Sequence, residues 1–201
     1  MNTDHSFELT LDPDPLAQFH AWFADARAAL EQPDAVALAT ATPDGRPSVR
    51  MVLLKRADEQ GFGFHTNLDS RKGVELAANP RAALLFHWQP LGRQVRIEGA
   101  VEAAPAQESE AYFRTRPLPS RLAAWASPQS RPLADRAELE RRYAEATARF
   151  EGDDVPLPPH WGGFRLVPDA YEFWQHGEHR LHDRLRYERA GAGWRRERLA
   201  P

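Results

Sequence analysis

The strongest constraint on the fold is a series of short segments in which apolar and polar residues alternate between turn residues. In the segment QVRIEGAVE at 94–102, the apolar Val95, Ile97 and Val101 alternate with charged side chains, which is the period of a half-buried strand. A Pro-Asp-Gly turn at 43–46 separates two further apolar runs, as in an antiparallel hairpin. The sequence therefore predicts antiparallel strands joined by tight connections.

Helical patterns lie between and around these strands. Apolar residues at helical spacing predict a helix at 14–31, with Asp12 or Asp14 as its N-cap. Further helices are predicted at 71–78, 105–116, 119–127 and 134–152, and strands at 35–42, 48–55, 62–66, 81–88, 94–102, 164–168, 170–175, 181–188 and 194–199. We interpret the chain as one α+β domain over 1–201, built on a barrel or strongly coiled sheet, with 1–13 as a flexible N-terminal segment.

Composition excludes several classes of protein. No apolar run approaches the ~20 residues that cross a bilayer, and the polar N-terminus has no secretory signature, so we expect a cytoplasmic protein. The absence of cysteine excludes disulfides, thiolate nucleophiles and iron-sulfur clusters. The net charge of −3 gives no general attraction to nucleic acids or anionic membranes. The glycine-rich, metalloprotease and serine-hydrolase motifs of common enzymes are missing.

A histidine cluster near the C-terminus suggests a metal site only weakly. His176, His179 and His182, with Glu178 among them, offer donor atoms that zinc accepts. A spacing of three residues along a strand or turn scatters these rings over alternating faces. We therefore predict no metal.

The segment Ser70-Arg71-Lys72 is a candidate phosphate site. It stands where the helix at 71–78 would begin, and free backbone donors at a helix start, a hydroxyl and two cations suit a phosphate. An ordinary Ser N-cap followed by solvated charges would have the same sequence. The chain's only lysines are Lys55 and Lys72. Drift from Lys to Arg could leave these two by chance, whereas a compact ammonium also suits a phosphate or cofactor contact.

Strand parity groups further cations. It places Arg50 and Lys55 on opposite faces of one strand. A second strand would carry four basic side chains on one face, and such a row repels itself unless an anion lies against it or its outer members are solvated. These four residues are Arg180, His182, Arg184 and Arg186.

Several motifs together resemble one enzyme family. They are RMVLLK at 50–55, SRK at 70–72, NPR at 79–81, RQV at 93–95, WGGFR at 161–165, FWQ at 173–175, GEHRLHDR at 177–184 and RLAP at 198–201. In this combination the chain resembles the pyridoxine (pyridoxamine) 5′-phosphate oxidase family, in register from about residue 35 to the last residue.

The resemblance implies a split β-barrel homodimer with FMN at the subunit interface. It implies oxidation of pyridoxine or pyridoxamine 5′-phosphate to pyridoxal 5′-phosphate, with O2 as electron acceptor and H2O2 as product. The implied FMN-binding residues are Arg50, Met51, Val52, Leu53, Leu54, Lys55, His65, Thr66, Arg71, Lys72, Gln94, Gln129, Ser130, Trp174 and Arg184. The implied substrate-binding residues are Lys55, Tyr112, Arg116, Ser120, Arg180, Leu181 and His182.

The resemblance also suggests how these residues divide the work. The FMN phosphate would face Arg50, Arg71 and Lys72. The substrate phosphate would be held by Lys55, Tyr112, Arg116 and Ser120. As catalytic residues, Arg180 and His182 would orient the pyridine ring over the flavin and assist deprotonation at C4′ during hydride transfer to flavin N5.

The chain departs from the family pattern in two places. A Tyr is common where His65 stands, and either ring can lie beside a flavin and hydrogen bond. The segment SFELTLDPDP at 6–15 lacks the arginines that close over substrate in some relatives. Because a missing lid contact removes binding more than transition-state stabilisation, we expect a raised KM with the chemistry retained.

Two other functions stay open. One is a split-barrel flavin or deazaflavin reductase of another substrate, although such an enzyme would not need the whole implied substrate set. The other is a protein that binds or carries pyridoxal 5′-phosphate with little turnover. Peroxide formation from pyridoxamine 5′-phosphate separates the three possibilities.

Overall fold

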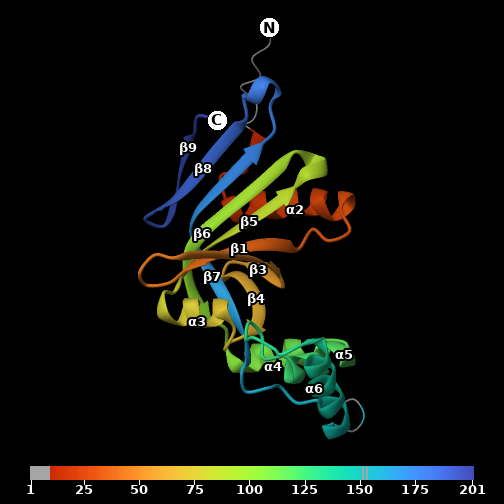
Figure 1. Cartoon of the computed structure of the whole chain (residues 1–201). Helices are drawn as coiled ribbons and strands as arrows, with labels where there is room; N and C mark the ends of the chain where they lie inside the picture. Colours follow the sequence, from red (N-terminus) through yellow and green to blue (C-terminus); the bar gives the residue numbers. More distant parts are fainter. Residues whose placement is uncertain (1–9, 151, 153) are drawn as a thin grey trace.

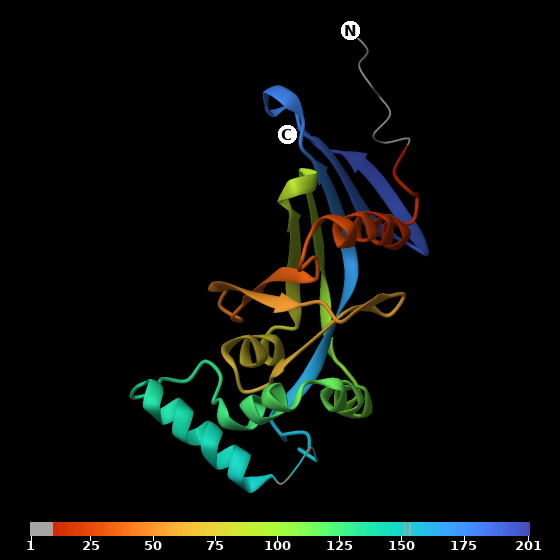
Figure 2. The same cartoon turned by 90° about the vertical axis from the view of Figure 1, so that its right-hand side faces the viewer.

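A strongly curled antiparallel sheet with helices around it forms the molecule, an α+β split-barrel-like fold as expected (Figures 1 and 2). The computed structural model describes residues 10–150, 152 and 154–201. Its helices are α2 (Pro15–Ala29), α3 (Arg71–Ala78), η1 (Gln89–Leu91), α4 (Ala106–Thr115), α5 (Leu118–Ala126), α6 (Arg136–Arg149) and η2 (Glu178–Arg180). Its strands are β1 (Ala35–Ala41), β2 (Pro47–Leu53), β3 (Arg56–Asp58), β4 (Gly61–Asn67), β5 (Arg81–Trp88), β6 (Arg93–Ala103), β7 (Trp161–Gln175), β8 (Asp183–Ala190) and β9 (Gly193–Arg198).

The long strand β7 joins the two halves of the sheet. The strand order is β2-β1-β5-β6-β7-β4-β3, with β8 paired to β7 and β9 to β8. Residues 161–166 of β7 pair with β4, whereas residues 170–175 pair with β8. Pro168, which has no N–H to donate, lies where the partner changes. At this level β6 contains a bulge at Glu98/Gly99, and a Cβ on Gly99 would lie 2.0 Å from the carbonyl oxygen of Val167.

Two apolar clusters support the two ends of the molecule. In the larger one, Phe19 of α2 is fully buried, with its ring 4.9 Å from that of Phe62 and 5.1 Å from that of Phe86. The smaller cluster lies under α4, α5 and α6 and includes Phe113 and Trp161. It fixes these helices against the start of β7, beside the cavity described below. In both views α4–α6 lie at the opposite end from the turn that follows β7 (Figures 1 and 2).

Most predicted elements are present, and the differences have local causes. The helix predicted at 71–78 and the strand predicted at 81–88 have those bounds. The predictions of separate strands at 164–168 and 170–175 are wrong, because β7 runs through both as one strand. The polar segment after β2 contains the short strand β3, which sequence reasoning missed.

The start of the chain is only partly described. Residues 1–9, which fall in the segment expected to be flexible and in the altered lid segment, lie outside the described residues. From there on the chain packs against the fold, because Leu11 is buried and the Tyr187 hydroxyl donates to the Asp12 carbonyl at 2.8 Å. No helix in the described part of the chain has the length and apolar character to span a membrane.

Candidate functional site

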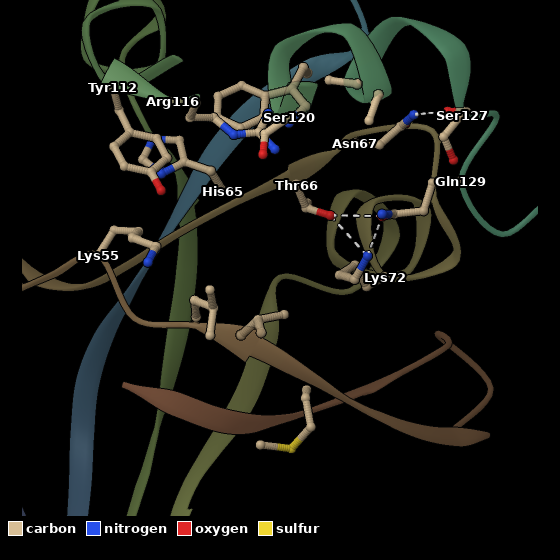
Figure 3. A pocket seen from close by; sticks show the side chains of 16 residues that line it. Lys55, His65, Thr66, Asn67, Lys72, Tyr112, Arg116, Ser120, Ser127 and Gln129 are labelled. Carbon is tan, nitrogen blue, oxygen red and sulfur yellow. Dashed lines mark hydrogen bonds between the residues drawn. The ribbon is translucent and has the colours of Figure 1, made fainter. Parts of the chain in front are cut away.

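A cavity of about 400 Å³ lies among β2, β4, the start of α3 and helices α4 and α5 (Figure 3). Many of the predicted site residues line it together: Met51, Val52, Leu53, Lys55, His65, Thr66, Lys72, Tyr112, Arg116, Ser120 and Gln129. The remaining lining residues, which sequence reasoning missed, are Asn67, Ala123, Ala124, Ser127 and Trp161. The fold thus brings segments from four parts of the chain to one cavity.

Lys72 is a buried cation that is held by neutral oxygens. It is 8% exposed, and its Nζ donates to Thr66 Oγ1 at 2.9 Å, Ser70 Oγ at 3.2 Å and Gln129 Oε1 at 2.6 Å. Burial, followed by the charge of Arg50, lowers the pKa of Lys72 to about 8. None of its hydrogen-bond partners in the described part of the chain is a carboxylate. A buried ammonium without a counter-ion favours an anion in the adjoining space.

The start of α3 fixes the position of Lys72. Ser70 is the N-cap, and its hydroxyl accepts from the N–H of Gly73 at 3.4 Å. A Cβ on Gly73 would lie 2.1 Å from the carbonyl oxygen of Leu68, so only glycine lets the turn before the helix pack this closely. The Ser70-Arg71-Lys72 segment is therefore a true helix start with a buried lysine in its first turn.

His65 lies in a stack of aromatic rings at the cavity wall. Its ring centroid is 4.4 Å from that of Tyr112 and 5.2 Å from that of Trp161, with all three rings nearly parallel. Neither imidazole nitrogen has a hydrogen-bond partner among the described residues. Burial lowers the pKa of His65 to about 4, and the charges of Arg116 and Lys55 act in the same direction. His65 is consequently neutral at pH 7.

Arg116 is a second cation without a carboxylate partner in the described part of the chain. Its guanidinium lies 5.0 Å from the centroid of the Trp161 ring, and its Nη1 is buried without a partner within the described chain. Burial lowers its pKa, and the described residues place no carboxylate on it. Ser120 lines the cavity from α5 (Figure 3). This side of the cavity therefore also favours an anion.

Lys55 approaches the cavity from the end of β2, on the opposite side from Lys72 (Figure 3). Its backbone N–H donates to the Gly63 carbonyl at 2.8 Å, and its Nζ is 3.1 Å from Asp34. The ion pair is partly exposed on both sides, so solvent weakens it. Lys55 can therefore exchange this partner for a ligand at little cost.

Some predicted cofactor residues lie beside the cavity and do not line it. Arg50 and Arg71 both bond to the buried carboxylate of Glu75 behind the start of α3. Leu54 is buried in the main core and faces away from the cavity. Ser130, in the loop between α5 and α6, is exposed and has a φ of 71°.

A second group of predicted residues lies at the opposite end of the molecule. Gln94, Trp174 and Arg184 are direct neighbours across β6, β7 and β8. Arg180 belongs to η2, in the turn between β7 and β8, and Leu181 follows it with most of its surface exposed. One copy of the chain therefore brings the predicted residues together in two separate sets.

The prediction that Arg180 and His182 continue a strand face is wrong. Strand β8 begins at Asp183, and residues 178–180 form the turn η2, in which His179 and Arg180 have φ values of 53° and 66°. Gly177 permits this turn, because a Cβ there would lie 2.0 Å from the Leu181 carbonyl oxygen. Only Arg184 and Arg186 of the predicted row share a face of β8. Alternation along the segment could not reveal the turn.

The turn also selects the tautomer of the neutral His182 ring. Its Nδ1 accepts from the Gly177 N–H at 3.2 Å, and its ring lies 4.6 Å from the Trp174 ring. A neutral His182 therefore carries its proton on Nε2 and presents a donor. In the described part of the chain, no group of three or more His, Asp or Glu side chains is placed to hold a metal ion.

Strand β2 exposes an apolar face next to the cavity. Val49 and Met51 are 69% and 62% exposed, and Leu53 is the third exposed apolar residue of the strand. Alternate residues of a strand share a face, so these three form a continuous apolar row. Rows of this kind mark surfaces that other molecules cover.

Comparison with known proteins explains this combination of cavity and exposed surface. The family model described as pyridoxamine 5′-phosphate oxidase matches residues 24–150. A second model, described as the C-terminal dimerisation region of pyridoxine 5′-phosphate oxidase, matches residues 161–201. The chain belongs to the pyridoxamine 5′-phosphate oxidase family. The dimerisation region contains β7, β8 and β9 and therefore includes Trp174, Arg180 and Arg184 of the second group, whereas Gln94 of β6 lies in the first match.

Curated members of the pyridoxamine 5′-phosphate oxidase family match nearly the whole chain. The pyridoxine/pyridoxamine 5′-phosphate oxidase of Rubrobacter xylanophilus is 60% identical over 191 residues, which cover 94% of this chain and 88% of that protein. The protein of the same name from Sphingopyxis alaskensis is 57% identical, over 95% and 89% of the two chains.

Two solved structures share the fold. PhzG from Burkholderia lata, determined with tetrahydrophenazine-1-carboxylic acid, is 36% identical with a TM-score of 0.90, over 100% of this chain and 98% of that one. A pyridoxamine 5′-phosphate oxidase-related, FMN binding protein from Nostoc punctiforme is 19% identical with a TM-score of 0.74, over 95% and 100% of the two chains. The second likeness concerns the fold alone. Membership of the pyridoxamine 5′-phosphate oxidase family points to a flavin cofactor.

Proposed function

We propose that this protein is an FMN-dependent pyridoxamine (pyridoxine) 5′-phosphate oxidase that works as a homodimer and uses O2 as its electron acceptor. The observation that carries the proposal is the pair of cations, Lys72 and Arg116, that face one cavity without carboxylate partners in the described chain. Two uncompensated cations at separate points of the cavity suit two anionic groups. A phosphorylated cofactor beside a phosphorylated substrate supplies that number.

The residues fit FMN on one side of the cavity. The capped start of α3 offers backbone N–H groups and the ammonium of Lys72 to a phosphate, while the buried Ser70 hydroxyl donates to the Asn67 carbonyl at 2.6 Å. The parallel rings of His65 and Trp161 add an apolar wall that suits a flat ring system. When bound, the flavin supplies a two-electron acceptor that O2 reoxidises with release of H2O2.

The substrate phosphate would lie on the other side of the cavity. Lys55, Arg116, Tyr112 and Ser120 converge there (Figure 3). Each charge-assisted hydrogen bond to such a phosphate contributes about 1.5–3 kcal/mol. Lys55 can leave Asp34 for this contact, because their ion pair is partly exposed and solvent weakens it.

A homodimer would complete the site. The turn with Arg180 and His182 lies at the end of the molecule opposite to the cavity of its own chain (Figures 1 and 2). A two-fold interface places the same patch of each subunit against its partner. The exposed row on β2 and the dimerisation region over 161–201 support a pairing in which the turn of one subunit covers the cavity of the other.

In this site Arg180 and His182 would act on the substrate ring. Arg180 would place a permanent charge beside the pyridine and assist loss of the proton from the amine or hydroxyl group on C4′, while C4′ itself gives up one hydrogen with its electron pair. His182, with Nδ1 occupied by the Gly177 N–H, would orient the substrate by donating from Nε2. Pyridoxamine 5′-phosphate would give an imine that water hydrolyses to the aldehyde.

The decisive experiment combines the visible spectrum of the purified protein with peroxide release. We expect a yellow protein that releases FMN on heating and converts pyridoxamine 5′-phosphate to pyridoxal 5′-phosphate with one H2O2 per turnover. A reductase of another substrate would form neither product. A carrier would bind pyridoxal 5′-phosphate with at most a trace of peroxide. A colourless protein that stays inactive after FMN is added would refute the proposal.

The catalytic assignment has its own test. Arg180→Gln should reduce kcat by roughly 100-fold or more, in the range that loss of a group assisting proton transfer causes. The flavin absorbance of the variant should stay at the wild-type level. Turnover close to wild type would remove Arg180 from the mechanism.

A further inference from the structure

Glu75 is a buried carboxylate behind the predicted phosphate site. It lies on α3 and is 5% exposed. Its Oε2 accepts from Thr40 Oγ1 and Ser48 Oγ, each at 2.5 Å, and from Arg50 Nη2 at 3.2 Å. Its Oε1 accepts from Arg71 Nε at 2.8 Å. Each oxygen therefore holds a different guanidinium.

The two arginines are left with different capacities for a ligand. Both terminal nitrogens of Arg50 are used inside the protein, Nη1 by the Leu38 carbonyl and Thr40 and Nη2 by Ser48 and Glu75. Arg71 uses only Nε, and its Nη1 and Nη2 have no partner among the described residues. Its side chain is 59% exposed in the first turn of α3, next in sequence to Lys72. Arg50 is thus held by contacts inside the protein. Arg71 keeps two guanidinium nitrogens, Nη1 and Nη2, that are available to donate to a ligand.

We propose that Glu75 is a positioning residue for the phosphate site, which holds Nε of Arg71 so that the Nη edge of that guanidinium is available to a phosphate at the start of α3. The inference rests on the proposed function, because the phosphate is that of FMN. Arg50, Thr40 and Ser48 keep the carboxylate fixed. The fixed carboxylate removes much of the rotational freedom that Arg71 would otherwise lose on binding.

The third predicted FMN-binding arginine, Arg184, is held by a buried glutamate in the same way as Arg71. Glu172 is also buried, and its Oε1 accepts from Arg184 Nε at 2.8 Å while its Oε2 accepts from Arg96 Nη2 at 2.5 Å. In both clusters one buried glutamate fixes the Nε of a predicted FMN-binding arginine and is braced by a second arginine. The recurrence at two distant places supports a positioning role.

Positioning and simple charge have opposite effects on FMN affinity. A carboxylate near a phosphate repels it, so a Glu75 that acted only through its charge would weaken FMN binding and its removal would strengthen it. A Glu75 that positions Arg71 strengthens FMN binding, and its removal weakens it. The sign of the change therefore decides between the two roles.

The test measures flavin affinity in two variants. Glu75→Gln keeps the shape and removes the charge, whereas Glu75→Asp keeps the charge and withdraws the carboxylate by one methylene. The full-length proteins, freed of flavin, are titrated with FMN and with riboflavin, which lacks the phosphate. Glu138→Gln is the matched control, because its carboxylate pairs with Arg142 across one turn of α6, as Glu75 does with Arg71 on α3.

We expect the Kd for FMN to rise roughly tenfold or more in both Glu75 variants, which is the loss of about one charge-assisted contact. The Kd for riboflavin should stay within about twofold of wild type, and Glu138→Gln should match wild type for both flavins. Tighter FMN binding, unchanged FMN binding, or an equal loss for both flavins would each overturn the inference. A wild-type protein that fails to bind FMN would instead overturn the proposed function.

Discussion

Among single residues, the contrast between paired and unpaired cations identifies the site. Arg165 bonds to Glu108 at 2.8 Å and Arg81 to Asp169 at 2.5 Å, as is usual for arginines near a surface. Lys72 is more buried than either and has only neutral acceptors in the described chain. The sequence shows Ser70-Arg71-Lys72 as a possible phosphate seat. It cannot show that Gln129, far along the chain, completes the environment of Lys72.

The lowered pKa of Lys72 predicts how FMN affinity depends on pH. Below its pKa of about 8 the ammonium is already charged, so affinity should be nearly constant. Above this pH, binding must recapture a proton, and the Kd for FMN should rise by up to about tenfold per pH unit. Titrations from pH 6.5 to 9.5 check this. In Lys72→Gln the affinity should be lower throughout and this rise absent; an equal rise would exclude Lys72 as its source.

The half-buried His65, whose ring nitrogens are shielded from solvent, predicts a loss of stability in mild acid. Its pKa is about 4 in the folded protein and 6.5 in the unfolded chain, so the unfolded state binds more protons between these values. Its contribution to the free energy of unfolding is present above pH 6.5 and is lost as the pH falls toward 4. Urea denaturation of wild type and His65→Phe should show a smaller decrease for the variant over this range. Parallel curves would indicate that His65 is charged or solvated in the fold.

For helices and strands, the local sequence pattern predicts which type of element forms better than it predicts where that element is interrupted or continues. The alternation of Val95, Ile97 and Val101 correctly places all three on the buried face of β6. The turn η2 was missed because His179 and Arg180 adopt left-handed backbone conformations that neither residue type favours. The packing that selects them involves Gly177 against the Leu181 carbonyl, a contact that alternation along the sequence does not encode.

The start of α3 should be sensitive to one methyl group. In Gly73→Ala the new Cβ would meet the Leu68 carbonyl oxygen at 2.1 Å, so the turn before the helix must move. We expect a loss of about 1–3 kcal/mol in the free energy of unfolding, together with weaker FMN binding because Lys72 moves with the helix. Gly193→Ala, with no atom within 4 Å of the added Cβ, is the control. A variant as stable as wild type, with normal FMN affinity, would contradict this account of the helix start.

For the whole molecule, the separation of the two residue groups predicts complementation between subunits. Arg116→Ala removes a residue of the cavity, and Arg180→Ala removes a residue of the distant turn, so each homodimer should be nearly inactive. Mixed subunits that reassociate at random form about half hybrid dimers, each with one intact and one doubly altered site. Activity should return to about a quarter of wild type, measured as peroxide release. No recovery after confirmed subunit exchange would place both residues in one subunit's site.

The length of β7 limits which insertions and deletions such a dimer can accept during evolution. The strand carries Trp161 at the cavity end and Trp174 near the η2 end, so it sets the spacing between the two halves that each subunit contributes. In the proposed pairing, the two copies of this strand run in opposite directions, and the length of each sets the spacing between the residues that one subunit contributes to the two active centres. Inserting a residue pair at Pro168 would leave each half intact yet misalign both active centres at once. We therefore expect length changes to accumulate in the α5–α6 connection and the β8–β9 hairpin rather than in this strand.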